Sequence, residues 1–195
     1  MACHWTAFDK VSSRVARQRL ADVLRRDSYE FLNPAVPTPG LTRHVVIVGD
    51  LNEEPMAHVF RDSLIGCRDR ESSRHAPRQD KQVRRVRLYN AAWRFLGEQV
   101  AHGVAGAPVG AAGTFYNDSK DVDTRGWRTF DHLLVSAKLL GETPPYLDES
   151  KTGIVSTPTM RDAAGLPMPF TSSDQRGVSD HLPIIGRIVL REVSE

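Results

Sequence analysis

Apolar residues in this chain fall into short runs and helical periods, a pattern typical of a domain built from short strands and short helices. Residues 45–48 form an uninterrupted Val-Val-Ile-Val run, which predicts a strand buried in the middle of a sheet and covered on both sides. Residues 113–116, 127–136 and 184–190 also have strand-like composition. Together with the helices described next, these strands predict a layered α/β or α+β domain.

Apolar residues with helical spacing occur in three segments. Ser12 or Ser13 can cap the first helix. The apolar side of this helix is expected to carry Val15, Ala16, Leu20, Val23 and Leu24. A second helix is expected to open at Pro55 and to run to about residue 64, and a third to span residues 88–99.

Length and composition allow one domain with a real core. The chain has 195 residues, of which 40% are hydrophobic and 26% charged, so we expect a single domain over residues 1–195. Residues 66–87 and 141–178 are expected to be surface loops. No apolar run approaches the roughly 20 residues of a membrane span, and the first residues lack a secretory pattern, so a cytoplasmic location is expected.

The positive charges are concentrated in one segment. The formal net charge is only +2, yet the segment from Arg61 to Arg87 holds nine basic and four acidic residues. Such a segment can attract a phosphate-bearing substrate or a nucleic acid. The favoured interpretation of the segment is a solvated loop, because residues 72–82 contain few apolar side chains, and such a loop is compatible with this attraction.

Three short segments combine acidic, amide and imidazole groups. Gly-Asp-Leu-Asn at 49–52 directly follows the predicted buried strand, at a position where catalytic groups often gather; these residues could equally form a simple turn. In the strand 127–136, alternation places Asp131 on the same side as Leu133 and Val135. A carboxylate on an apolar face is costly without a partner, so Asp131 needs one. His181, within Ser-Asp-His-Leu-Pro, is the candidate, because a carboxylate can orient an imidazole for proton transfer.

These segments, taken together and in this order, resemble the endonuclease/exonuclease/phosphatase superfamily, the DNase I-like metal-dependent phosphoesterases. The resemblance rests on Gly-Asp-Leu-Asn at 49–52, Phe-Asp-His-Leu-Leu-Val-Ser at 130–136 and Ser-Asp-His-Leu-Pro at 179–183. His4-Trp5 is similar to an upstream strand of the family whose histidine contacts phosphate in several members. The similarity extends from about residue 3 to residue 190 and implies a four-layer sandwich of two sheets flanked by helices.

The resemblance also implies roles for individual residues. Asp50 would position or activate the attacking water, and Asn52 would hold the phosphate. Asp180 would be a metal ligand, with Asp50 also at the metal. His181 would contact the phosphate or exchange protons with it, oriented by Asp131. A hard divalent ion, Mg²⁺ or Mn²⁺, suits oxygen ligands, whereas a zinc site would want a compact His/Cys cluster that is missing from the sequence.

One part of the family pattern has no counterpart in this chain. Family members begin with further strands that carry an Asn and a metal-binding Glu, so the resemblance implies a domain that lacks its N-terminal part. Two functions therefore stay open. The first is a metal-dependent phosphoester hydrolase, with a phosphodiester favoured among DNA, RNA, phospholipid, inositol and nucleotide phosphates. The second is a non-catalytic module that binds nucleic acid or a partner through the segment from Arg61 to Arg87.

Overall fold

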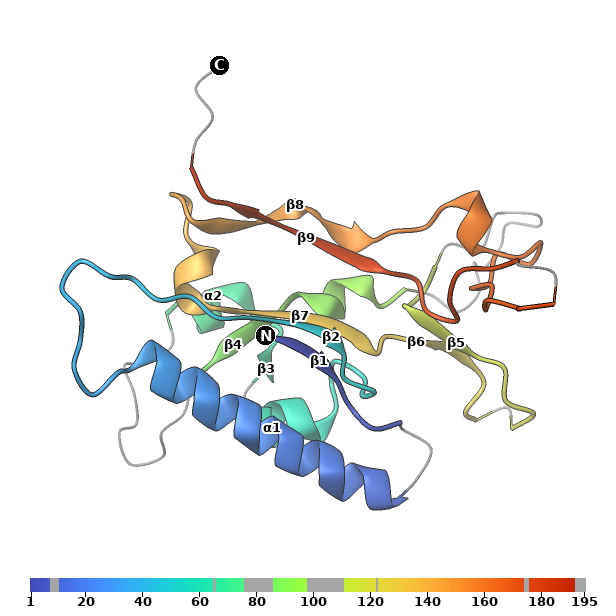
Figure 1. The fold of residues 1–195 in the computed structure, drawn as a ribbon, viewed down its shortest axis with the longest axis horizontal. Helices are drawn as coiled ribbons and strands as arrows, with labels where there is room; N and C mark the ends of the chain where they lie inside the picture. Colours follow the sequence, from blue (N-terminus) through green and yellow to red (C-terminus); the bar gives the residue numbers. More distant parts are fainter. Residues whose placement is uncertain are drawn as a thin grey trace.

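A five-stranded mixed sheet lies at the centre of the molecule (Figure 1). The computed structural model describes residues 1–7, 11–64, 66–75, 86–97, 111–121, 123–173 and 176–191. The strand order is β1–β2–β7–β4–β3. These strands are β1 (Ala2–His4), β2 (Val46–Asp50), β7 (Asp131–Ser136), β4 (Leu88–Asn90) and β3 (Gly66–Cys67). β7 pairs antiparallel with both β2 and β4, while the outer strands β1 and β3 pair parallel with their neighbours.

Two antiparallel strand pairs, one long helix and several short helical segments complete the described part of the chain. The pairs are β5 (Phe115–Asn117) with β6 (Gly126–Arg128), and β8 (Tyr146–Ile154) with β9 (Ile184–Val189). The α-helices are α1 (Val11–Leu32) and α2 (Arg70–Arg74). A π-helical segment, η1, spans Val59–Leu64. Three 3₁₀ turns are η2 (Ala91–Phe95), η3 (Ala137–Leu140) and η4 (Pro158–Met160).

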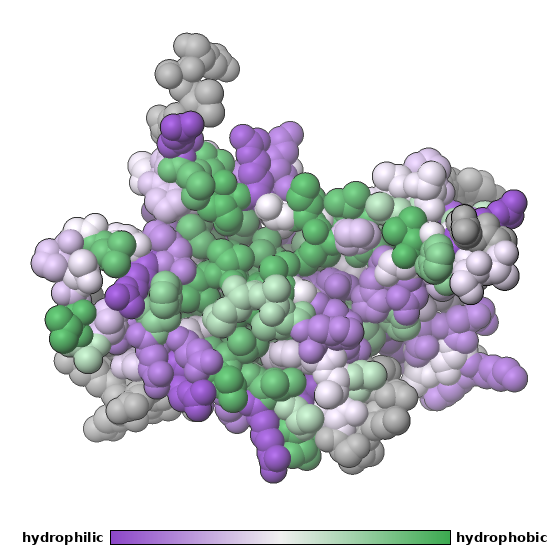
Figure 2. All heavy atoms as spheres, viewed as in Figure 1, coloured by the Kyte–Doolittle hydropathy of each residue, from purple (hydrophilic) through white to green (hydrophobic). Residues whose placement is uncertain are grey.

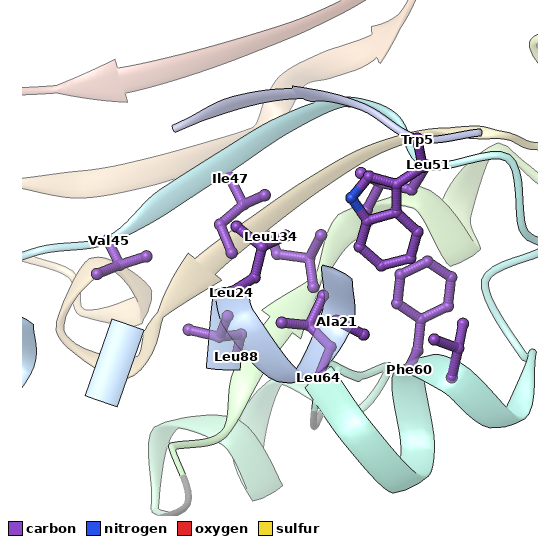
Figure 3. Packing of buried hydrophobic residues seen from close by; sticks show 11 residues of the cluster. Trp5, Ala21, Leu24, Val45, Ile47, Leu51, Phe60, Leu64, Leu88 and Leu134 are labelled. Atoms are coloured by element: carbon purple, nitrogen blue, oxygen red, sulfur yellow. The ribbon is translucent and has the colours of Figure 1, made fainter. Parts of the chain in front are cut away.

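One face of the central sheet is covered by α1 and η1. The core on this side includes Ala21 and Leu24 of α1, Phe60 of η1, and Ile47 and Leu134 of the sheet (Figure 3). Ile47 and Leu134 lie opposite each other across β2 and β7 and are both fully buried. Burial of such side chains stabilises the layer by about 1.5–3 kcal/mol each.

The other face of the sheet is covered by the β8–β9 pair. Leu133 and Val135 of β7 form a second core with Leu147 of β8, and Ile188 of β9 packs against it. Gly186 permits the close approach, because a Cβ at this position would meet the Leu133 side chain at 2.5 Å. The described residues thus form three layers in a mixed α+β fold, and the four-layer arrangement stays a prediction (Figure 1).

Helix α1 differs from the expected amphipathic helix in length and in its buried side. It continues to Leu32, and Ser12 and Ser13 lie inside it instead of capping it. Val15, Leu20 and Val23 of the expected apolar side are exposed. Of the expected residues, Leu24 is buried. The buried side of the helix combines small, apolar and polar residues, namely Arg17, Ala21, Leu24 and Ser28. The helix is oriented by a buried ion pair of Arg17 with Glu53, at 2.8 Å, which hydrophobic periodicity does not register.

Two expected elements near the site are wrong. Residues 127–136 form two strands in different sheets, β6 and β7, because the chain leaves one sheet at residues 129–130 and joins the other. The helix expected over residues 88–99 is instead the strand β4 followed by the short turn η2, since backbone pairing to β7 outweighs the helical spacing of the side chains. Residues 98–99 lie outside the described residues.

Other boundaries also change. The helix expected from Pro55 begins at Val59, and the strand expected at 113–116 starts at Phe115. The strand expected at 184–190 is confirmed as β9. The segments 66–87 and 141–178, expected to be surface loops, contain regular structure: β3, α2 and the nine-residue β8. Residues 76–85 of the first segment lie outside the described residues.

Apolar side chains are exposed beside β9. Val48 of β2 is 37% exposed, Ile185 of β9 is 53% exposed and Leu190 is 75% exposed. Figure 2 shows apolar side chains gathered over the middle of this face, where β9, β2 and β1 lie in Figure 1. The strand at 45–48 was expected to be covered on both sides, but within the described structure β9 lies over β7 and leaves Val48 open. None of the helices among the described residues combines the length and the apolar character required to cross a bilayer.

Gly49 allows β1 and β2 to lie close enough to pair. Its φ is +138°, and a Cβ there would collide with the backbone carbonyl of Cys3. We expect Gly49→Ala to lower the free energy of unfolding by about 2 kcal/mol or more, because it adds both strain and overlap. The measurement is a urea titration. Gly153→Ala is the matched control, since a Cβ meets nothing within 4 Å there, and equal losses in the two variants would contradict the explanation.

Candidate functional site

The register of three neighbouring strands brings polar groups together at one end of the central sheet. His4 of β1 lies beside Asp50 of β2, and Asp50 lies directly opposite Asp131 of β7. The His4 Nε2 atom is 3.5 Å from Asp50 Oδ2. His4 is well exposed, with 80% of its side chain accessible, whereas the two carboxylates are 17–18% accessible. Three of the predicted site residues therefore form one row across the strand ends.

His181 joins this row from the segment that precedes β9. Its Nδ1 atom lies 2.7 Å from Asp131 Oδ2, which confirms the contact expected from the sequence. Its Nε2 atom is 4.0 Å from Asp50 Oδ2. Because the Nδ1–H donates to a carboxylate, Nε2 is the nitrogen left to exchange a proton with a bound group.

Burial and neighbouring charges shift two pKa values at the site. Burial raises the pKa of Asp50, and this outweighs the backbone N–H of Asn52 and the nearby histidines, which lower it. Burial alone would lower the pKa of His181, but the hydrogen bond to Asp131 and the carboxylate charges around the ring raise it above its ordinary value overall. The shift of the His181 pKa favours its cationic form, whereas the shift of the Asp50 pKa favours its protonated form.

The Asn52 side chain is turned toward the protein. Its amide nitrogen donates to the backbone oxygen of Trp5 at 3.0 Å and to Asp50 Oδ2 at 2.9 Å. An amide has two hydrogens, so both are occupied, and exchanging its O and N would place an acceptor against two acceptors. The backbone N–H of Asn52 also donates to Asp50 Oδ1. In this conformation Asn52 orients Asp50, and the predicted contact with phosphate requires release of one of these bonds.

Two residues that the sequence did not single out hold the Asp131–His181 pair in place. The buried Thr114 accepts backbone N–H groups from Phe130 and Asp131 at its hydroxyl, and from Leu182 at its carbonyl. The Phe115 ring lies 4.9 Å from the His181 ring. Neither residue carries a signal in hydrophobic periodicity, because both act through contacts with segments distant along the chain.

The loop after β2 is fixed by contacts on both sides. His132, which points away from Asp131 as expected for strand alternation, lies with Nε2 2.8 Å from the carbonyl of Glu53. Burial lowers the pKa of His132 to about 4, so it is neutral at neutral pH and donates from Nε2. Glu54 accepts the backbone N–H of Thr129 at 3.2 Å. The loop that follows Asp50 is thus tied by hydrogen bonds to Thr129 and to His132 of β7.

A pocket of about 570 Å³ opens beside His181 and Asn52. Asp180 also lines it, and Phe115 and Phe130 form an apolar wall. Asp180 is exposed, and its carboxylate is 3.5 Å from the hydroxyl of the adjacent Ser179. The predicted metal ligand therefore faces the same space as the imidazole.

The donor set fits a divalent cation only in part. Among the residues that the structure describes, no group of three or more His, Cys, Asp or Glu side chains could hold a metal ion. Mg²⁺ commonly takes one or two carboxylates, with water and substrate phosphate as the remaining ligands. Asp180 and Asp50 would fit that role only together with a bound phosphoester.

In the described part of the basic segment, two arginines lie beside carboxylates. Arg61 pairs with Asp62 at 2.8 Å, and Arg70 contacts Glu71 at 3.2 Å. Arg61 lies on η1 and Arg70 on α2, whereas His4 lies on β1, at the edge of the central sheet opposite β3. Attraction of a nucleic acid by this segment stays a prediction.

Comparison with known proteins adds little. No protein-family model matches the chain, and no curated protein matches it. Among solved structures, a beta toxin from Staphylococcus aureus is similar with a TM-score of 0.41 and 15% sequence identity. The match covers 95% of this chain and 50% of the toxin chain, so this chain spans about half the length of that protein. A likeness at this level identifies no function.

The Asp131 carboxylate is expected to control the titration of His181. Because its hydrogen bond and charge favour the imidazolium, we predict that Asp131→Asn lowers the pKa of His181, measured by NMR titration of the ring protons. His132 should stay silent between pH 5 and 8, since its pKa is about 4. Asp148→Asn is the control, because Asp148 pairs with Arg187 on the β8–β9 layer. An unchanged His181 pKa in the Asp131 variant would contradict the assignment.

Proposed function

We propose that the protein is a hydrolase of phosphoester bonds, with a phosphodiester as the favoured substrate. The observation that carries the proposal is the arrangement of His181: its Nδ1 atom is bonded to Asp131 and its Nε2 atom faces Asp50 beside a pocket. An imidazole oriented in this way is suited to proton transfer at an oxygen leaving group. The resemblance to the endonuclease/exonuclease/phosphatase superfamily supports the same reaction.

The residues divide the reaction between an acid and a base. Asp50 accepts a proton from water as the water oxygen forms a bond to phosphorus. His181 in its protonated form donates the Nε2 proton to the departing oxygen as the P–O bond breaks. His4, exposed at the end of β1, is placed to contact the phosphoryl group. Asn52 and Asp131 orient Asp50 and His181 through the hydrogen bonds described above.

A divalent cation is part of the proposal. Mg²⁺ or Mn²⁺ would be held by Asp180 and Asp50 together with oxygens of the substrate. When bound, it supplies neutralisation of the phosphoryl oxygens and stabilisation of the departing oxygen.

Hydrolysis of bis(p-nitrophenyl) phosphate tests the catalytic role of His181. We expect His181→Ala to lower kcat by about 10²- to 10⁴-fold, the usual contribution of a positioned acid or base. The rate of the native protein should be highest between the raised pKa of Asp50 and the raised pKa of His181. His75→Ala is the control, because His75 ends α2 and contacts Glu71 on the surface.

Two outcomes would contradict the proposal. Equal rates in the native protein and in His181→Ala would remove His181 from the reaction. No hydrolysis by the pure native protein would favour the alternative, a non-catalytic module that binds nucleic acid or a partner. A filter-binding measurement with short DNA and RNA would then test that alternative directly.

Removal of divalent cations tests the proposed cofactor. We expect EDTA to reduce the rate of phosphodiester hydrolysis and added Mg²⁺ to restore it. Asp180→Asn should raise the Mg²⁺ concentration needed for half of the maximal rate, because it removes a charged ligand. Asp162→Asn, at an exposed turn outside the site, should leave that concentration unchanged. A rate that is insensitive to EDTA would rule out the cation requirement.

A further inference from the structure

The pocket beside His181 lies between two parts of the chain that belong to different sheets. Asn52 follows β2 of the central sheet, whereas Asn117, Ser119 and Thr124 belong to the β5–β6 pair and to the connection between its two strands (Figure 1). Among the described strands, neither β5 nor β6 pairs along its length with a strand of the central sheet. Other contacts must therefore set the distance between the two sides of the pocket.

Backbone contacts fasten the β5–β6 pair at the end near Thr114. The Thr114 carbonyl accepts a backbone N–H from the segment before β9, and Phe115 forms an isolated bridge with His181. Thr124 lies at the opposite end of the pair, in the connection between the two strands. Its backbone N–H donates to the carbonyl of Asp121 within the same connection. The position of this end relative to the central sheet therefore depends on side chains.

The side chain of Arg128 on β6 makes the connection. Its Nη2 atom donates to the carbonyl of Thr124 at 2.8 Å, and its Nη1 atom lies 3.7 Å from Oε1 of Glu54. Glu54 stands in the loop after β2, and its Oε2 atom accepts the backbone N–H of Thr129 at 3.2 Å. The guanidinium thus joins the loop that follows Asp50 to the far side of the pocket.

The same carbonyl of Thr124 accepts a second hydrogen bond. The side-chain amide of Asn117 on β5 donates to it at 2.8 Å. A carbonyl oxygen has two lone pairs, so both are used by Asn117 and Arg128. Asn117 holds Thr124 within the β5–β6 pair, whereas Arg128 holds both of them to Glu54. Loss of Arg128 would leave the internal bond and remove the link to the loop after β2.

An arginine suits this link better than a lysine does. The guanidinium has two terminal nitrogens in a fixed plane and can reach two acceptors at once, whereas a lysine has one nitrogen at the end of a flexible chain. The Arg128 side chain is 24% exposed, and its buried Nε atom has no hydrogen-bond partner among the described residues. The contacts of the terminal nitrogens therefore determine the orientation of the side chain.

We propose that Arg128 is a positioning residue that holds the side of the pocket formed by Asn117 and Thr124 against the loop after β2, and so sets how tightly the group attached to the phosphate is bound. The proposal rests on the proposed function in so far as the bound phosphate is the one that is hydrolysed. Arg128 has no part in proton transfer, because its described contacts are with Glu54 and Thr124.

Steady-state hydrolysis of bis(p-nitrophenyl) phosphate by the full chain tests the proposal. We expect Arg128→Met to raise KM at least about threefold and to leave kcat unchanged, because binding is weakened equally before and during the reaction. The pKa of His181, measured by NMR titration, should stay at its native value, which also shows that the variant is folded. Arg125→Met is the matched control, since Arg125 pairs with the exposed Asp118 within the same strand pair, and should leave KM unchanged.

A lysine variant separates the link from a simple effect of charge. Arg128→Lys keeps the positive charge but not the two terminal nitrogens, so we expect the same rise in KM as in Arg128→Met. A native KM in Arg128→Lys would show that charge alone is needed and would contradict the proposal.

A double-mutant cycle locates the effect in the contact with Glu54. Glu54→Gln removes the charge at the other end of the link and should by itself raise KM. Because both substitutions break one link, the double variant Arg128→Met with Glu54→Gln should raise KM no more than Arg128→Met alone. Increases that multiply in the double variant would show two independent effects and would overturn the proposal. Glu54→Gln also tests the link if Arg128→Met fails to fold.

The outcomes separate this inference from the proposed function. A native KM in Arg128→Met, or a fall in kcat larger than the rise in KM, would overturn the inference and leave hydrolysis through His181 standing. If the native protein hydrolyses no phosphoester, calorimetric binding of bis(p-nitrophenyl) phosphate replaces KM. Weaker binding by Arg128→Met would then support the inference while the proposed function fails, and equal binding or no binding by the native protein would overturn both.

Discussion

The antiparallel register of β2 and β7 is the constraint on which the site depends. It places Asp50 directly opposite Asp131, and β1 adds His4 next to Asp50. Like charges at this spacing repel each other and resist burial. The arrangement is stabilised because His181 lies between the two carboxylates, bonded to Asp131 and 4.0 Å from Asp50. A one-residue slip of either strand would turn one carboxylate to the opposite face and remove the site.

The surroundings of these groups favour a preorganised site. The loop after β2 is held at Glu53 by two contacts: the Arg17 guanidinium pairs with the Glu53 carboxylate, and the neutral His132 donates to the Glu53 carbonyl. Asn52 fixes both oxygens of Asp50. Buried polar networks whose members are satisfied rigidify the structure around them. In the proposed reaction, His181 and Asp50 would thus be oriented before the substrate binds, as proton transfer at a phosphoester requires.

The pocket beside His181 and the basic segment differ in the charged groups that they present. Within the described part of the basic segment, Arg61 pairs with Asp62 and Arg70 with Glu71. The pocket beside His181 has aromatic, amide and hydroxyl groups and one carboxylate, Asp180. In the proposed reaction, the pocket beside His181 is therefore the candidate contact for the group attached to the phosphate.

The sequence alone determined the features that follow from local alternation. The strand at 184–190, the inward direction of Asp131 and its need for His181 all follow from the period of two in a strand and from the cost of a buried carboxylate. The strand in place of the helix at 88–99 did not follow, because pairing with β7 overrides side-chain spacing. Contacts between distant segments escape any local pattern.

Only the tertiary structure decided how the groups of the site are held. Thr114 receives backbone N–H groups from the segments before β7 and β9, and Phe115 packs on His181, although neither belongs to a recognisable motif. The inward turn of Asn52 likewise depends on the carbonyl of Trp5, 47 residues away in sequence. These contacts depend on strand register and on where the loops close. The same side-chain types could satisfy several local patterns, and only the packed sheet selects one.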